Sequence, residues 1–174
     1  MLNSILSSIS RIDYVRPDDI PNIDLYMDQV ITYLYEHLKQ TYYNEEKFIT
    51  NAMINNYVKT GIVNRPIKKH YTKQHLAYFI AVTILKRCYS MQQISEMIYI
   101  QIHTKNSSIE QAYDLFITRF EDSLNAVFET NSSLNATFNS TSYEQKLLDN
   151  VIQCIIYKIH TEHVLSTKKQ KSES

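Results

Sequence analysis

The chain has very few of the residues that make tight turns. Among its 174 residues glycine occurs once, as Gly61, and proline occurs only as Pro17, Pro21 and Pro66. Antiparallel sheets and sandwiches need frequent turns that rely on such residues, so this composition disfavours them. Leucine, isoleucine, lysine, glutamine, glutamate and tyrosine are plentiful. The sequence therefore predicts an all-α fold, of a length that suits one compact domain with an extension.

Cysteines and long apolar runs are also scarce. The two cysteines, Cys88 and Cys154, lie far apart and outside any C-x-x-C spacing, which disfavours a zinc site and a disulfide framework. No stretch approaches the roughly 20 apolar residues that span a bilayer, and residues 1–14 lack the pattern of a signal peptide. We therefore expect a cytoplasmic protein that does not enter a membrane.

The patterns that assemble catalytic sites are missing as well. The sequence has no glycine-rich phosphate loop, no catalytic triad and no cluster of metal ligands. His160 and His163 lie near Glu162, but a histidine pair at a helix end is more often a solvated cap than a metal site. We therefore expect neither an enzyme nor a bound metal or cofactor.

Acidic residues are absent from the middle of the chain. The formal net charge of the whole chain is zero, yet residues 47–95 contain eight lysines or arginines and no aspartate or glutamate. Such segregation makes one region strongly basic although the average is neutral. The eight bases are Lys47, Lys59, Arg65, Lys68, Lys69, Lys73, Lys86 and Arg87.

Apolar residues recur at helical spacing along most of the chain. They predict helices over residues 1–12, about 22–39, 50–61, 72–88, 91–102, 109–128 and 143–165. The expected N-terminal caps are Asn22 or Asp24, Thr50 or Asn51, Thr72 and Ser90, and Gly61 is the expected left-handed C-terminal cap. Residues 131–142 have linker composition, and a disordered tail is expected from Ser166.

Residues 50–73 combine hydrogen-bonding side chains with positive charge. On the helix over 50–61, one face is apolar and the opposite face carries Asn51, Asn55, Asn56 and Lys59. Asparagine can pair bidentately with adenine in the major groove, and lysine can reach phosphate or guanine.

An extended loop is expected over residues 63–71, which are basic and contain Pro66. Its bases could bind phosphates. The other interpretation is a solvated polar face beside a basic surface. Together with the helix face, the candidate DNA-binding residues are Asn51, Asn55, Asn56, Lys59, Arg65, Lys68, Lys69, His70, Tyr71 and Lys73.

Three segments then follow a recognisable order. They are Met53-Ile-Asn-Asn-Tyr-Val-Lys-Thr-Gly-Ile62, Tyr71-Thr-Lys-Gln-His-Leu76 and Ile84-Leu-Lys-Arg-Cys-Tyr-Ser-Met-Gln-Gln-Ile94. This order resembles the MerR-type winged helix-turn-helix, in which a recognition helix is followed by a wing and a further helix. The resemblance implies that residues 50–61 form the recognition helix, with a minimal or absent wing over 63–71.

The chain departs from the MerR-type pattern at several positions. The Arg-Tyr pair of that family's recognition helix is replaced by Asn55-Asn56, and its glutamate by Val58. The turn before the helix, residues 41–49, is longer than the usual three or four residues, and no glycine stands at the tip of the wing. The family's base preference is therefore not carried over.

Over a longer span, Pro21 to Ile102, the chain resembles a bacterial family of unknown function. The matching strings are Asp24-Leu-Tyr-Met-Asp-Gln29, Met53-Ile-Asn-Asn-Tyr57, Lys69-His-Tyr71 and His75-Leu76. The expected division is an N-terminal helix or arm over 1–20, a MerR-like helix-turn-helix domain over 21–104, a C-terminal helical segment over 105–165 and a tail over 166–174.

Two functions of different classes follow from these patterns. The first is a sequence-specific protein that binds double-stranded DNA and regulates transcription, with a small-molecule effector possible. The resemblance implies a homodimer formed through the C-terminal helices, although those helices could instead close the core of a monomer. The second is a helical protein–protein interaction module that keeps a helix-turn-helix fold without binding DNA.

Overall fold

The computed structural model describes residues 15–42, 47–104, 107–129 and 142–172. Within these residues the fold is all-helical, as the composition predicted. The helix predicted over residues 1–12 lies outside the described residues, as does nearly all of the predicted linker. The α-helices are α2 (Met27–Leu38), α3 (Asn51–Lys59), α4 (Lys73–Leu85), α5 (Met91–Tyr99), α6 (Ile109–Glu129) and α7 (Tyr143–Ser172). Short helical turns are η1 (Pro17–Asp19), η2 (Lys39–Thr41) and the π-helical η3 (Ile100–Thr104).

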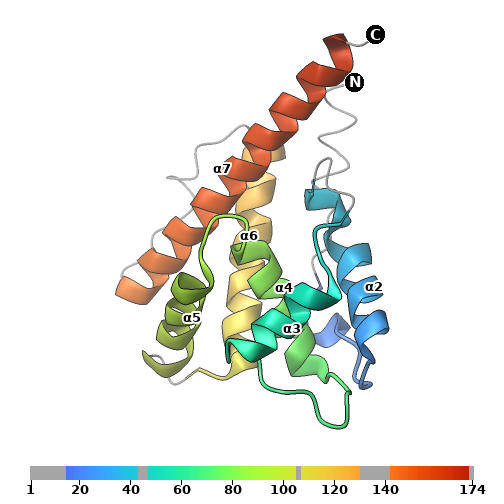
Figure 1. The fold of residues 1–174 in the computed structure, drawn as a ribbon. Helices are drawn as coiled ribbons and strands as arrows, with labels where there is room; N and C mark the ends of the chain where they lie inside the picture. Colours follow the sequence, from blue (N-terminus) through green and yellow to red (C-terminus); the bar gives the residue numbers. More distant parts are fainter. Residues whose placement is uncertain (1–14, 43–46, 105–106, 130–141, 173–174) are drawn as a thin grey trace.

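Helix α4 lies at the centre of the molecule. Nine of its thirteen residues are buried, on all sides of the helix, and it packs against α2, α6 and α7 (Figure 1). A helix that is apolar all round has to be enclosed by neighbours, because its surface would otherwise face water. Helices α6 and α7 provide much of that enclosure with Phe116, Phe120, Ile152 and Ile156, all in the same core as α2 and α3. The C-terminal helices therefore close the core within one chain.

Four of the expected caps are present, and Thr72 is one of them: it is the N-cap of α4, where its backbone N–H donates to the His75 ring nitrogen at 3.0 Å. The Thr50 hydroxyl accepts a hydrogen bond from the Met53 backbone N–H at 3.3 Å, and the Ser90 hydroxyl accepts one from the Gln93 N–H at 3.2 Å. The Gln93 side chain in turn accepts from the Ser90 N–H at 2.9 Å, which completes a capping box. Gly61 follows α3 with a φ of +77°, the left-handed conformation predicted for it.

Replacing Gly61 with alanine should lower the free energy of unfolding by about 1 kcal/mol, because a Cβ atom disfavours the left-handed conformation. The loss should be conformational only, since a Cβ at this position meets no atom within 4 Å. Asparagine tolerates positive φ better than alanine. In urea denaturation the free energy of unfolding should therefore be highest for the wild type, lower for Gly61→Asn and lowest for Gly61→Ala. An equal loss for both variants would contradict this explanation.

Some helix boundaries differ from the prediction. Helix α2 begins at Met27 and not after Asn22 or Asp24, because Leu25 pairs with Tyr71 through two backbone hydrogen bonds of 2.9 and 2.8 Å. Helix α4 ends at Leu85 instead of Cys88, because the backbone after Leu85 forms tighter turns with hydrogen bonds between residues three apart. Helix α7 continues to Ser172 and is therefore longer than the helix predicted over residues 143–165.

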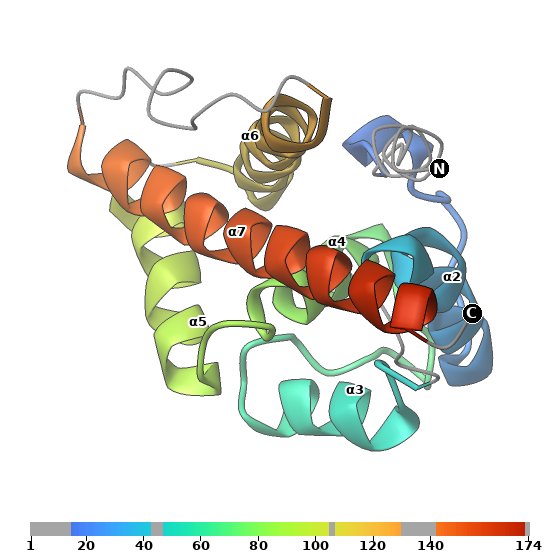
Figure 2. The same ribbon diagram turned by 90° about the horizontal axis from the view of Figure 1, so that it is seen from above.

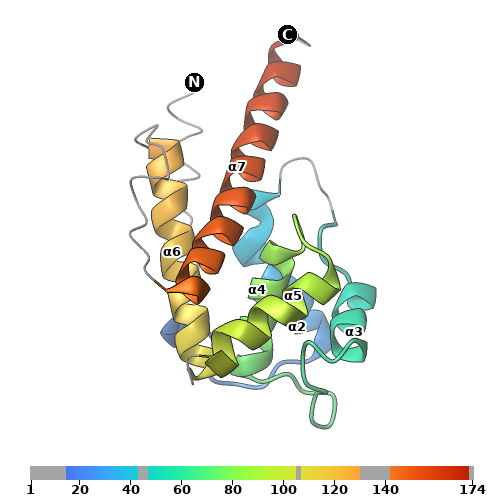
Figure 3. The same ribbon diagram turned by 90° about the vertical axis from the view of Figure 1, so that its left-hand side faces the viewer.

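Helix α3 and helix α6 lie on opposite sides of the molecule. Figures 2 and 3 both show α4 and α7 between them, with α3 at the outer surface. The loop that joins α3 to α4 projects at the end of the molecule next to α3 (Figures 1 and 3). None of the helices in the described ranges is both long enough and apolar enough to cross a membrane.

Candidate nucleic-acid interface

The outer face of α3 carries the four polar residues that the sequence singled out. Asn51, Asn55, Asn56 and Lys59 are all exposed. On the inner face, Ile54 and Tyr57 are fully buried, and burial raises the pKa of Tyr57 to about 12. The apolar anchors thus hold the helix against the core while its amide side chains stay free to contact a partner.

The loop after α3 ends in a two-residue turn. Ile67 and His70 exchange two backbone hydrogen bonds, of 2.9 and 3.2 Å, around Lys68 and Lys69. Both lysines have positive φ, +50° and +67°, as a type I′ turn requires. Such turns favour asparagine and glycine, because the left-handed conformation costs other residues about 1–2 kcal/mol each. The fold therefore places two exposed ammonium groups at the tip of a strained turn.

The base of this loop is fixed to the body. Tyr71 pairs with Leu25 and is 4 % exposed, and its ring lies 5.6 Å from the ring of Phe79. The His70 ring is half-buried 4.3 Å from that of Tyr26. Tyr71 was wrongly included among the candidate DNA contacts, because it has a core position, whereas His70 keeps part of its ring at the surface.

Six of the eight bases in the acid-free segment are exposed, and within the described part of the chain none of the six forms an ion pair. Lys73 differs from the prediction, because its ammonium group lies 3.4 Å from the Glu110 carboxylate and is half-buried. A base already neutralised within the protein contributes less to phosphate binding. The six bases are Lys47, Lys59, Arg65, Lys68, Lys69 and Lys86.

Arg87 has a structural position. Its side chain is 4 % exposed and pairs with Glu162 of α7. It also donates a hydrogen bond of 2.8 Å to the Thr41 carbonyl, and its guanidinium group lies 4.2 Å from the centre of the Tyr42 ring. These contacts connect the turn after α4 with η2 and α7. Sequence reasoning counted Arg87 as a basic residue without finding this role, because its partners are distant in the chain.

The two cysteines meet in the fold although they are far apart in the sequence. The Cys88 thiol, in the turn after α4, lies near Cys154 of α7, and both cysteines are free. Burial, and then the neighbouring Cys154, raise the pKa of Cys88 to about 11. The positive charges of Lys158 and Arg87 lower the pKa of Cys88, but by less than burial and Cys154 raise it. Cys88 is therefore a protonated, weakly nucleophilic thiol at neutral pH.

The comparisons with known proteins give one match. No curated protein and no solved structure matches the chain significantly. A family model described as "Domain of unknown function (DUF1836)" matches residues 15–116. The match begins before η1, includes α2 to α5 with the basic loop, and ends within α6. Because it covers more than half of the sequence, the chain belongs to this family of unknown function, DUF1836.

Proposed function

We propose that the chain binds double-stranded DNA, with α2 and α3 acting as a MerR-like helix-turn-helix and α3 lying in the major groove. The observation that carries the proposal is the strained Lys68-Lys69 turn beside the exposed amide face of α3. Strained backbone at an exposed site costs stability without any gain in packing, which is typical of functional positions. Two lysines there place positive charge where a wing meets the DNA backbone.

The dimensions of α3 suit this role. With nine residues the helix is about 13 Å long, close to the roughly 12 Å width of the major groove. Asn51, Asn55 and Asn56 would contact base edges from its outer face. Contacts to phosphates would come from the bases of the helix end and the loop: Lys59, Arg65, Lys68 and Lys69.

Regulation of transcription and homodimerisation stay predictions. The buried faces of α6 and α7 pack within one chain, so a dimer of this fold would use other faces of these helices. Exposed apolar side chains remain on α7 at Tyr157, Val164 and Leu165. The interaction-module hypothesis uses the same exposed α3 face with an acidic protein in place of DNA.

A salt titration of the affinity for duplex DNA tests the proposal. If four bases bind phosphates, the slope of log K against log salt should be about −3.6, so that affinity falls roughly 100-fold between 50 and 200 mM salt. Fluorescence anisotropy with a labelled duplex measures this directly. Poly-L-glutamate serves as the competitor that represents an acidic protein. Absence of DNA binding even at low salt would overturn the proposal in favour of a protein partner.

A further inference from the structure

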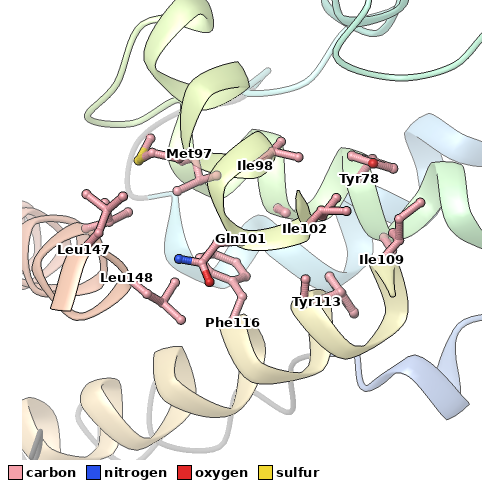
Figure 4. Close-up of a pocket in the computed structure, with 15 residues that line it drawn as sticks. Tyr78, Met97, Ile98, Gln101, Ile102, Ile109, Tyr113, Phe116, Leu147 and Leu148 are labelled. Carbon is pink, nitrogen blue, oxygen red and sulfur yellow. The ribbon is translucent and has the colours of Figure 1, made fainter. Parts of the chain in front are cut away.

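An apolar cavity of about 80 Å³ lies on the side of the molecule formed by α4, α5, α6 and α7. Figure 4 shows side chains from all these elements, and from η3, converging on it. Most of its lining residues lie in the part of the chain that the family model matches, and the rest belong to α7, which lies after that part.

The space exists because small side chains meet where two helices cross. Ala77 and Ala81 stand one turn apart on α4, and Ala112 lies on the facing part of α6. A leucine at any of these positions would fill much of the gap. The opposite wall includes Gln101 and Ile102 of the π-helical turn η3, which follows α5. An unfilled cavity lowers the stability of a fold, so a ligand that fills it would stabilise the protein.

The lining defines the chemistry of that occupant. None of the residues that line the cavity carries a charge, so a charged ligand would lose its hydration without compensation. The Tyr113 hydroxyl already donates to the Val15 carbonyl at 2.7 Å. The Gln101 amide nitrogen donates to the Glu144 carbonyl at 2.8 Å, which holds the side chain in place and leaves its oxygen as an acceptor.

We propose that this cavity binds a small uncharged aromatic molecule with a single ring and one hydrogen-bond donor, of the phenol class. An apolar cavity of about 150 Å³ stays dry and takes up benzene, so a space of this smaller size holds one ring at most. The rings of Tyr78, Tyr113 and Phe116 offer aromatic contacts, and the Met97 sulfur is a favourable neighbour for a ring. The Gln101 oxygen accepts the ligand's O–H. The proposal is independent of DNA binding.

Thermal unfolding of the full chain with phenol or toluene as the probe tests this site. At a concentration about ten times its Kd, either probe should raise the Tm by roughly 3–6 °C and in a saturable way. Ala112→Phe places a ring in the cavity and should weaken binding at least tenfold. Ala52→Phe, at an exposed position of α3, is the matched control and should bind as the wild type does. No saturable shift with the wild type, or unchanged binding by Ala112→Phe, would overturn the proposal.

Two further measurements keep the test decisive if Ala112→Phe does not fold. In the wild type, phenol should shift the methyl resonance of Met97 and leave that of Met53 on α3 unchanged. Gln101→Leu should weaken phenol binding about fivefold, the size of one neutral hydrogen bond, without weakening toluene binding. A Met53 shift without a Met97 shift, or equal effects of Gln101→Leu on both probes, would contradict the assigned site or the assigned hydrogen bond.

Discussion

Replacing Lys68 and Lys69 together with glutamate should lower the affinity for duplex DNA by about 100-fold or more near 100 mM salt, because two phosphate contacts become two repulsions. Both side chains are exposed at the tip of the loop, so the exchange removes no packing. Anisotropy titrations at several salt concentrations measure the loss, and the salt slope should also become shallower. The control is Lys146→Glu, an exposed lysine of α7, which should bind as the wild type does.

A second pair of substitutions at the same turn separates charge from backbone strain. Lys68→Asn with Lys69→Gly supplies the residues that a type I′ turn favours, and should raise the free energy of unfolding by about 1–2 kcal/mol in total. DNA affinity should nevertheless fall, since two ammonium groups are lost. Urea denaturation and anisotropy on the same preparation give both quantities. A more stable variant with unchanged DNA affinity would show that the two lysines do not contact phosphate.

Phe120→Ala should lower the free energy of unfolding by about 3–5 kcal/mol, because it leaves a cavity in a close-packed core. Phe120 lies on α6, is fully buried and belongs to the core that α2, α3 and α4 share with α7. Urea denaturation followed by circular dichroism measures the loss. Tyr143→Ala removes another aromatic ring where α7 begins, but that ring is 69 % exposed and its loss should change stability little.

The same experiment distinguishes a monomer core from a dimer interface. If α6 and α7 close the core of one chain, the effect of Phe120→Ala and the midpoint of unfolding should not change with protein concentration. If the helices are stable only when two copies pair, the midpoint should rise with concentration for the wild type. A small effect of Phe120→Ala would show that the C-terminal helices contribute little to the core.

The helices and most of their ends were predictable from the sequence because the signals for them are local. The apolar positions of α2, such as Val30 and Leu34, recur every three to four residues and are buried as expected. Thr50, Ser90 and Gly61 act as caps through contacts with residues only a few positions away. The exposed amide face of α3 follows from the same periodicity, since burying one side of a helix exposes the other.

The basic surface was predictable in outline only. Charge segregation identified the segment. Two of its bases, however, form ion pairs with acids of other helices: Lys73 with Glu110 of α6, and Arg87 with Glu162 of α7. Tyr71 looked available for phosphate contact because its role in pairing with Leu25 is not visible along the chain. Each of these outcomes depends on which distant residues pack together.

The sequence by itself determined the all-α class, the positions of the helices and the concentration of positive charge around α3, because these depend on residue type and short-range periodicity. Tertiary packing alone decided four other features, since residues far apart in the chain have to meet before any of them exists. It put two lysines in the left-handed conformation, brought Cys88 near Cys154, enclosed α4 with α6 and α7, and left a cavity where three alanines meet.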